Sequence, residues 1–192
     1  MIKLYRRSFT GMLILTVLVI TLAPLLLQAR PPKSEDELIA QLASSKERDV
    51  INALEQIEKQ YPTTTKALPA MKKLLADPRT KVQRKAARVL GVIHANVDST
   101  DIKNICELLK ASDKWTIVDG LIALRGLKAQ STIPQIIPLL QNPDLNVKRD
   151  SIRTLAVLGD KSLIPDIKPF LTYPDLAVQK DAADAIEILK EK

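Results

Sequence analysis

The strongest constraint on the fold is that the chain repeats itself. When residues 133–158 are shifted by 31 positions, prolines, turn residues and bulky apolar residues fall on similar residues within 164–189. The pairs aligned in this way include Pro134/Pro165, Pro138/Pro169, Ile133/Ile164, Ile136/Ile167, Leu140/Leu171, Leu155/Ile186 and Leu158/Leu189. A period near 30 residues with two apolar stripes in each unit predicts a solenoid, in which each unit buries its apolar face against its neighbours.

Three further copies precede these two. The copy one period earlier covers residues 102–127, and two more, at 68–93 and 38–57, follow the same pattern with small changes in loop length. The copy at 38–57 matches most weakly. We therefore predict a repeat domain over residues 38–192, preceded by a polar linker at 30–37 and a separate leader at 1–29.

Each unit is predicted to be two helices joined by a short turn. In the fourth unit, Ser131 or Thr132 caps the first helix, and Asn142-Pro143 ends it because proline cannot continue a helix. Asp144 then caps the second helix by accepting hydrogen bonds from free backbone N–H groups. No segment alternates with period two for long enough to be a strand, so the prediction is an all-α fold. The turns within the five units are expected near residues 44–47, 77–80, 111–114, 142–145 and 173–176.

The motifs of the fourth and fifth units also point to a known kind of repeat. The pattern Ile-Pro-x-Ile-x-Pro-x-Leu, followed by Pro-Asp-x-x-Val-Lys-Arg-Asp, resembles the HEAT repeat family, especially the short bacterial HEAT-like units of phycobilisome lyases. The resemblance covers about residues 38–192. It implies a right-handed α-solenoid of about five helix pairs, with first helices on the convex face and second helices on the concave face. It does not imply one activity, since the same fold serves many functions.

The leader indicates export. Lys3, Arg6 and Arg7 precede an uncharged, apolar stretch from Thr10 to Leu27. This pattern favours a signal peptide cleaved after Ala29, and the length of the apolar stretch leaves a retained membrane anchor as the alternative. With either alternative, we expect the repeats outside the cytoplasmic membrane, in the periplasm or tethered to the membrane.

The residues that usually carry catalysis are scarce. The chain has one histidine, His94, and one cysteine, Cys106, and no phosphate-binding or dinucleotide-binding motif. We therefore expect no catalytic, cofactor or metal site, and predict a non-catalytic scaffold that binds a protein partner. Two alternatives stay open: a bilin lyase or isomerase-like enzyme, which the family resemblance implies, and a membrane-tethered assembly factor.

Charge is concentrated in the second unit. The chain has a net charge of +7, and residues 66–93 contain eight lysines and arginines but only one acid. Four of these cations share one helix face by their i, i+3, i+4, i+7 spacing: Lys81, Arg84, Lys85 and Arg88. This face is either simply solvated or a site for an acidic protein or anionic phospholipid. Nucleic acid is disfavoured, because no aromatic residues lie between the cations and the chain is expected outside the cell interior.

Two further features concern the second helices. Trp115 occupies the repeat position of Lys81 and points away from the predicted core, so it is a candidate contact residue or a packing residue over the next unit. Acids also recur at one position, with a basic residue before most of them. The acids are Asp49, Asp119, Asp150 and Asp181, and the residues before them are Arg48, Val118, Arg149 and Lys180. This pattern predicts ion pairs between neighbouring second helices, with Arg84 contributing from the second unit, where Lys85 replaces the acid.

Overall fold

The computed structural model describes residues 32–192, within which Glu35–Lys192 form one compact unit. Both alternatives for the leader, signal peptide and anchor, concern residues outside this described part. None of the helices in residues 32–192 has the length and apolar character needed to span a membrane.

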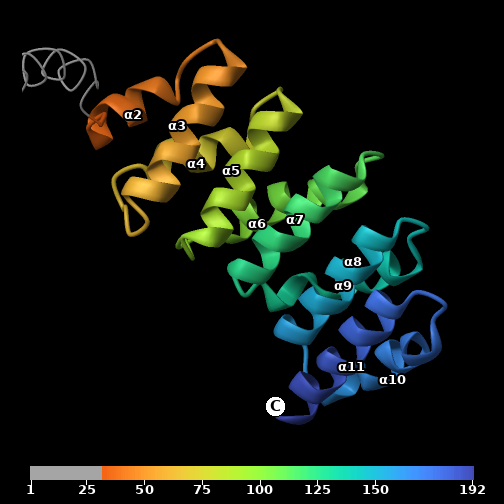
Figure 1. The fold of residues 1–192 in the computed structure, drawn as a ribbon. Helices are drawn as coiled ribbons and strands as arrows, with labels where there is room; N and C mark the ends of the chain where they lie inside the picture. The colour runs from red at the N-terminus through yellow and green to blue at the C-terminus, as the bar shows by residue number, and fades with distance from the viewer. Residues whose placement is uncertain (1–31) are drawn as a thin grey trace, which may run out of the picture. The chain divides into compact units, whose positions relative to one another are not determined.

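The described unit is all-α and consists of five helix pairs, as the repeat predicts (Figure 1). The first helices are α2 (Glu35–Gln41), α4 (Leu68–Lys73), α6 (Ser99–Glu107), α8 (Ile133–Ile136) and α10 (Ile164–Ile167). The second helices are α3 (Glu47–Gln60), α5 (Thr80–Val92), α7 (Lys114–Gly126), α9 (Leu145–Leu158) and α11 (Leu176–Lys190). The turns within all five pairs fall where the sequence placed them.

Aspartates begin the later second helices. The carboxylate of Asp144 accepts hydrogen bonds from the backbone N–H groups of Asn146 and Val147 at the start of α9. Asp175 and Asp113 cap α11 and α7 in the same way. The predicted cap at Asp144 is thus confirmed, and it satisfies backbone donors that the first turn of a helix leaves without partners.

The first helices are shorter than expected because they tighten into 3-10 helix. Beyond α8 and α10 the chain continues as η4 (Ile137–Gln141) and η6 (Lys168–Thr172), which contain Pro138 and Pro169. A proline inside a helix removes one backbone donor and clashes with the preceding turn, so the α-helical pattern stops before it. Shorter 3-10 segments, η1 (Leu74–Ala76) and η2 (Leu108–Lys110), follow α4 and α6.

Two local predictions were wrong. Thr132 occupies the N-cap position of α8, but neither its side chain nor that of Ser131 accepts a capping hydrogen bond. The chain enters α8 through the 3-10 turn η3 (Gln130–Thr132), and the Thr132 hydroxyl donates to the carbonyl of Ala129. Helix α2 begins at Glu35, inside the segment predicted to be linker. The acidic first turn of α2 explains this start, since negative charge stabilises a helix N-terminus.

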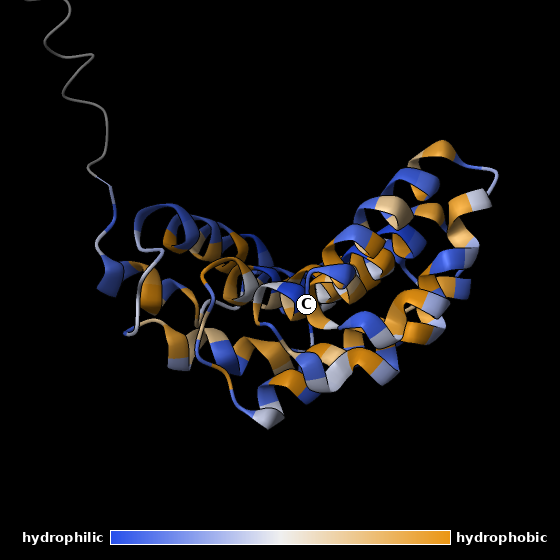
Figure 2. Cartoon of the chain, turned by 90° about the horizontal axis from the view of Figure 1, so that it is seen from below, coloured by the Kyte–Doolittle hydropathy of each residue, from blue (hydrophilic) through white to orange (hydrophobic). Residues whose placement is uncertain are grey.

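Taken by itself, the unit 35–192 is a curved stack of two helix layers (Figure 2). Its helices contribute the buried apolar side chains of one continuous core. Each second helix packs along the next one, whereas successive first helices touch at few residues. The more closely packed layer lies on the inside of a curve, so the second helices form the inner layer. Helices α5 and α7 approach most closely, at Gly91 and Gly126. A Cβ atom added to Gly126 would lie 2.3 Å from the Gly91 carbonyl oxygen.

Candidate partner-binding surface

The exposed side of the second helices, which we call the inner face, carries the predicted basic cluster. On α5 the opposite side is fully buried through residues such as Val82, Ala86 and Leu90. The helical spacing therefore places the four cations together on the inner face, as predicted. The sequence left two alternatives for these cations, a solvated face or a free cationic site. In the structure, each of the four instead pairs with acidic side chains of a neighbouring second helix.

Two of the four cations contact the preceding second helix. The Lys81 ammonium lies 3.5 Å from a Glu47 carboxylate oxygen on α3. The Lys85 ammonium lies between Glu55 and Glu58, at 3.3 and 3.5 Å. These contacts join α3 to α5 through charge.

The other two contact the following helix, α7. Arg84 donates from Nε to Asp119 at 2.8 Å and also reaches Asp113 at 3.2 Å, and Arg88 reaches the second oxygen of Asp119 at 3.5 Å. We call this arrangement, two arginines one turn apart on one aspartate of the next helix, an arginine clamp. It confirms the predicted ion pairs between second helices.

The same clamp recurs between α9 and α11. Arg149 donates to Asp181 at 2.6 Å, and Arg153 donates to the other oxygen at 2.9 and 3.0 Å. The repeat thus reproduces not only the helices but also the ion pairs between them.

The junction between α7 and α9 has no clamp. Its two arginine positions are occupied by Val118, which is buried, and Ile122, which is half-buried. Arg125 instead reaches Asp150 from the last turn of α7, at 3.5 Å. The centre of the inner face is consequently less charged than the two regions beside it.

Trp115 lies on this central helix and is 50% exposed. It is therefore a surface residue rather than a packing residue over the next unit. The Lys114 ammonium lies 5.4 Å from the centre of its ring, and the same ammonium pairs with Asp144 of the following unit at 3.0 Å. Trp115 and Ile122 are seven residues apart, so they share the exposed side of α7. Sequence reasoning missed Ile122, although its position is the one that Arg88 and Arg153 occupy.

The predicted cations separate into two groups by exposure. The side chains of Arg84 and Lys85 are 25% and 20% exposed, and each contacts two carboxylates of neighbouring helices. Lys81 and Arg88 are 73% and 43% exposed, and their ion pairs are long, at 3.5 Å. The last two side chains can therefore turn toward a partner at little cost, whereas the first two hold helices together.

The remaining chemically versatile side chains do not gather into a site. His94 is exposed in the loop before α6, with a backbone φ of 50°, and its Nδ1 donates to the carbonyl of Gly126 at 2.8 Å. Burial raises the pKa of the Cys106 thiol, which makes it a weaker nucleophile at neutral pH. Residues 32–192 contain no group of three or more histidine, cysteine or acidic side chains that could hold a metal ion.

Comparisons with known proteins bear on the fold. No protein-family model matches the sequence, and a search of curated proteins finds no match. Solved structures do match. The complex of CpcE and CpcF of phycocyanin lyase from Nostoc is similar with a TM-score of 0.71 and 24% identity, over 86% of this chain and 68% of that one.

Designed repeat proteins are similar as well. A designed armadillo repeat protein in complex with the peptide (KR)4 has a TM-score of 0.62 and 18% identity, over 79% of this chain and 80% of that one. Another designed armadillo repeat protein has a TM-score of 0.58 and 20% identity over the same shares. At such identities the likeness establishes architecture and not activity. The described part of the chain is therefore an α-solenoid of HEAT-like and armadillo-like helical repeats.

Proposed function

We propose that this protein is a non-catalytic scaffold that binds a protein partner on its inner face, outside the cytoplasmic membrane. The observation that carries the proposal is Trp115, a half-exposed tryptophan in the one junction where apolar residues replace the arginine clamp. Repeat proteins with curved stacks commonly present such extended surfaces to partners. The two similar structures that contain a protein complex or a bound peptide support this general role.

The chemistry of the surface suggests what the partner offers. Tryptophan is enriched among the few residues that carry most of the binding energy in interfaces, and such residues lie near the centre of the contact. Ile122 extends the apolar area along α7, and Lys81 and Arg88 lie on the adjoining helix. We propose that an apolar side chain of the partner packs on Trp115 and that acidic side chains beside it pair with Lys81 and Arg88. Ion pairs to those two cations would replace long and exposed ones.

The proposed location rests on residues 1–29. Their basic start and apolar stretch are typical of export, and the repeats would then act in the periplasm or beside the membrane. Intact-mass measurement of the protein isolated from cells tests this part separately. A mass that corresponds to a chain beginning at Arg30 indicates cleavage. A mass that includes residues 1–29 favours a membrane-tethered assembly factor.

The test of the binding surface compares captured proteins. The Trp115→Ala variant is expected to capture at least about tenfold less of the specific envelope proteins that the unchanged chain captures, because Trp115 would be a central contact residue. Leu171→Ala is the matched control, because Leu171 is also a large exposed apolar residue but belongs to the first-helix layer. If the Trp115 variant and the unchanged chain are both folded and capture equal amounts, the partner does not bind on α7.

An enzyme is the second candidate, and one observation favours it: the similarity to the phycocyanin lyase complex. If the chain has a related activity, it should attach a bilin to phycocyanin or remove one from it. Incubating the protein with phycocyanin and bilin, and following the visible absorption of the product, distinguishes the two functions. A catalysed change in bound chromophore would replace the scaffold proposal.

A further inference from the structure

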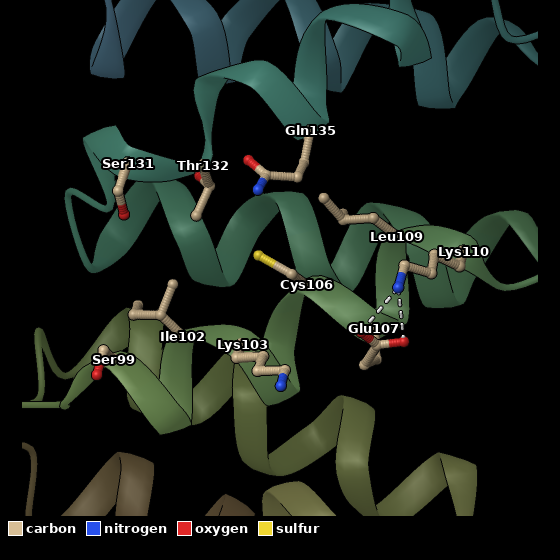
Figure 3. A pocket seen from close by; sticks show the side chains of 10 residues that line it. All are labelled: Ser99, Ile102, Lys103, Cys106, Glu107, Leu109, Lys110, Ser131, Thr132 and Gln135. Atoms are coloured by element: carbon tan, nitrogen blue, oxygen red, sulfur yellow. Dashed lines mark hydrogen bonds and ion pairs between the residues drawn. The ribbon is translucent and has the colours of Figure 1, made fainter.

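A pocket of about 510 Å³ lies in the first-helix layer, between α6 and the start of α8. One wall comes from α6 and η2, and the other from η3 and α8 (Figure 3). The volume falls within the range of sites that bind small molecules, about 300–1,000 Å³. The pocket is separate from the inner face, which the second helices form.

The repeat explains why the first-helix layer is open here. Thr132 lines the pocket, and its equivalent in the next unit is Leu163. The Leu163 side chain is buried against Gly159 and lines a smaller pocket of about 170 Å³, which shares four lining positions with the first: Gln130, Ile133, Ser162 and Leu163. A threonine in place of a leucine thus leaves room that the following junction fills with a side chain.

The pocket wall on α6 and η2 is apolar. Ile102, Cys106 and Leu109 follow i, i+4, i+7 spacing, so they form one stripe along this segment, and the Cys106 thiol points into the gap (Figure 3). Ile102 and Cys106 are only partly buried, although they pack against the core. The stripe therefore offers an apolar molecule a surface that the protein itself leaves partly uncovered.

The mouth of the pocket is polar and positive. Lys103 and Lys110 line it, opposed by the single carboxylate of Glu107, which pairs with Lys110 at 2.8 Å. Lys103 is exposed and makes no ion pair within the described residues. The side chains of Ser99, Ser131 and Gln135 add neutral hydrogen-bonding groups around the opening. One cation at the edge of an apolar wall is complementary to one anionic group on an apolar body.

We propose that this pocket binds a small amphipathic carboxylate, such as a medium-chain fatty acid. The acyl chain lies along Ile102, Cys106 and Leu109, and the carboxylate meets the Lys103 ammonium at the mouth. This site is independent of the partner-binding surface proposed above. A failure of either proposal would leave the other in place.

The first experiment fills the pocket. Decanoate binding is measured by calorimetry on the protein as it is isolated from cells. Thr132→Leu copies the residue of the next unit and is expected to weaken binding by about 10- to 200-fold, because each methylene-sized change in an apolar pocket has effects of that size. Thr132→Val is the matched control, since it removes the hydroxyl that donates to Ala129 but keeps the volume. Equal weakening by both variants, or by neither, would overturn the proposal.

The second experiment needs no change in the core. The chain has a single cysteine, so alkylation of Cys106 by neutral iodoacetamide at about pH 9 can be followed by intact mass. Decanoate should slow this reaction in the unchanged chain, and 1-decanol should require a higher concentration to do so. Lys103→Gln should reduce the preference for decanoate by about twofold to fivefold, the effect of an exposed ion pair. If decanoate does not change the alkylation rate of Cys106, decanoate does not occupy the pocket, and the proposal is wrong.

Discussion

The α9/α11 junction and the α7/α9 junction use equivalent positions of the same repeat, but different chemistry holds them together. At the first, Arg149 and Arg153 both bind Asp181, whose side chain is only 8% exposed. At the second, the arginine positions are apolar, and two separate ion pairs remain, from Arg125 to Asp150 at 3.5 Å and from Lys114 to Asp144 at 3.0 Å. Because both junctions stack the same way, the clamp is one means of filling this layer and not a requirement of the fold. The unclamped junction is therefore free to present an apolar surface to a partner.

The largest loss of stability is expected from a substitution in the apolar core that both junctions share. Leu155 on α9 is fully buried, and it packs within the layer that both junctions share. Leu155→Ala should lower the free energy of unfolding by about 2–5 kcal/mol, the usual range for a buried leucine. Urea denaturation followed by circular dichroism measures it. A change within experimental error would mean that the repeat register is wrong.

A smaller loss of stability is expected from a substitution at the closest contact between second helices, where α5 meets α7. A Cβ atom at Gly126 would strike the backbone of Gly91, so Gly126→Ala must move α7 away from α5. We expect a loss of about 1–3 kcal/mol, as for other overpacked positions. Val157 occupies the same repeat position on α9 and is exposed, so Val157→Ala is the control and should change stability little. Equal stability of the two variants would show that α5 and α7 can separate without cost.

The clamp itself can be compared with the unclamped junction by removing one carboxylate from each. Asp181→Asn removes the carboxylate that Arg149 and Arg153 share and should cost about 1–3 kcal/mol. Asp150→Asn removes two long ion pairs, to Arg125 at 3.5 Å and to Arg153 at 3.9 Å, and should cost less than about 1 kcal/mol. Thermal unfolding at low salt and in 1 M NaCl measures both, and salt should reduce both differences. If Asp150→Asn proved the more harmful, the clamp would contribute little to holding α9 and α11 together.

The smallest expected effect is a dependence on acid. The Thr116 hydroxyl lowers the pKa of Asp113, and the Lys114 ammonium lowers the pKa of Asp144, at the start of the helices that flank the central junction. Because the folded pKa lies below the unfolded value, the stabilisation is complete above about pH 4 and disappears as the pH falls through the lower folded value. Urea denaturation between pH 7 and pH 3 should show this loss. Asp144→Asn should lose less stability over that range than the unchanged chain does.

Much of the fold was readable because its determinants are local. The proline pairs, the aspartate caps and the spacing of apolar residues act within one or two helical turns, and the structure reproduces the turns they predict. The errors at Thr132 and Glu35 are local too, and both concern how a first helix begins. Helix ends depend on a few competing hydrogen bonds, so they are less certain than helix interiors.

The candidate site was only partly readable. The sequence placed Lys81, Arg84, Lys85 and Arg88 on one face, but their partners come from α3 and α7, which the spacing within α5 cannot identify. Lys148 is a second example. It is buried, which lowers its pKa, and its ammonium donates to the carbonyl of Leu140 at 2.6 Å. Nothing in its own helix distinguishes it from an exposed lysine.

The sequence by itself determined the kind of protein this is: repeated helix pairs with an apolar stripe on each helix, and a recurring basic-acidic pattern on the second ones. Tertiary structure alone decided which charges meet, that Trp115 stays exposed beside Ile122, and that Thr132 leaves a pocket where Leu163 fills one. The physical reason is distance along the chain. Periodicity and capping act between residues a few positions apart, whereas ion pairs and pockets depend on how one unit is rotated against the next.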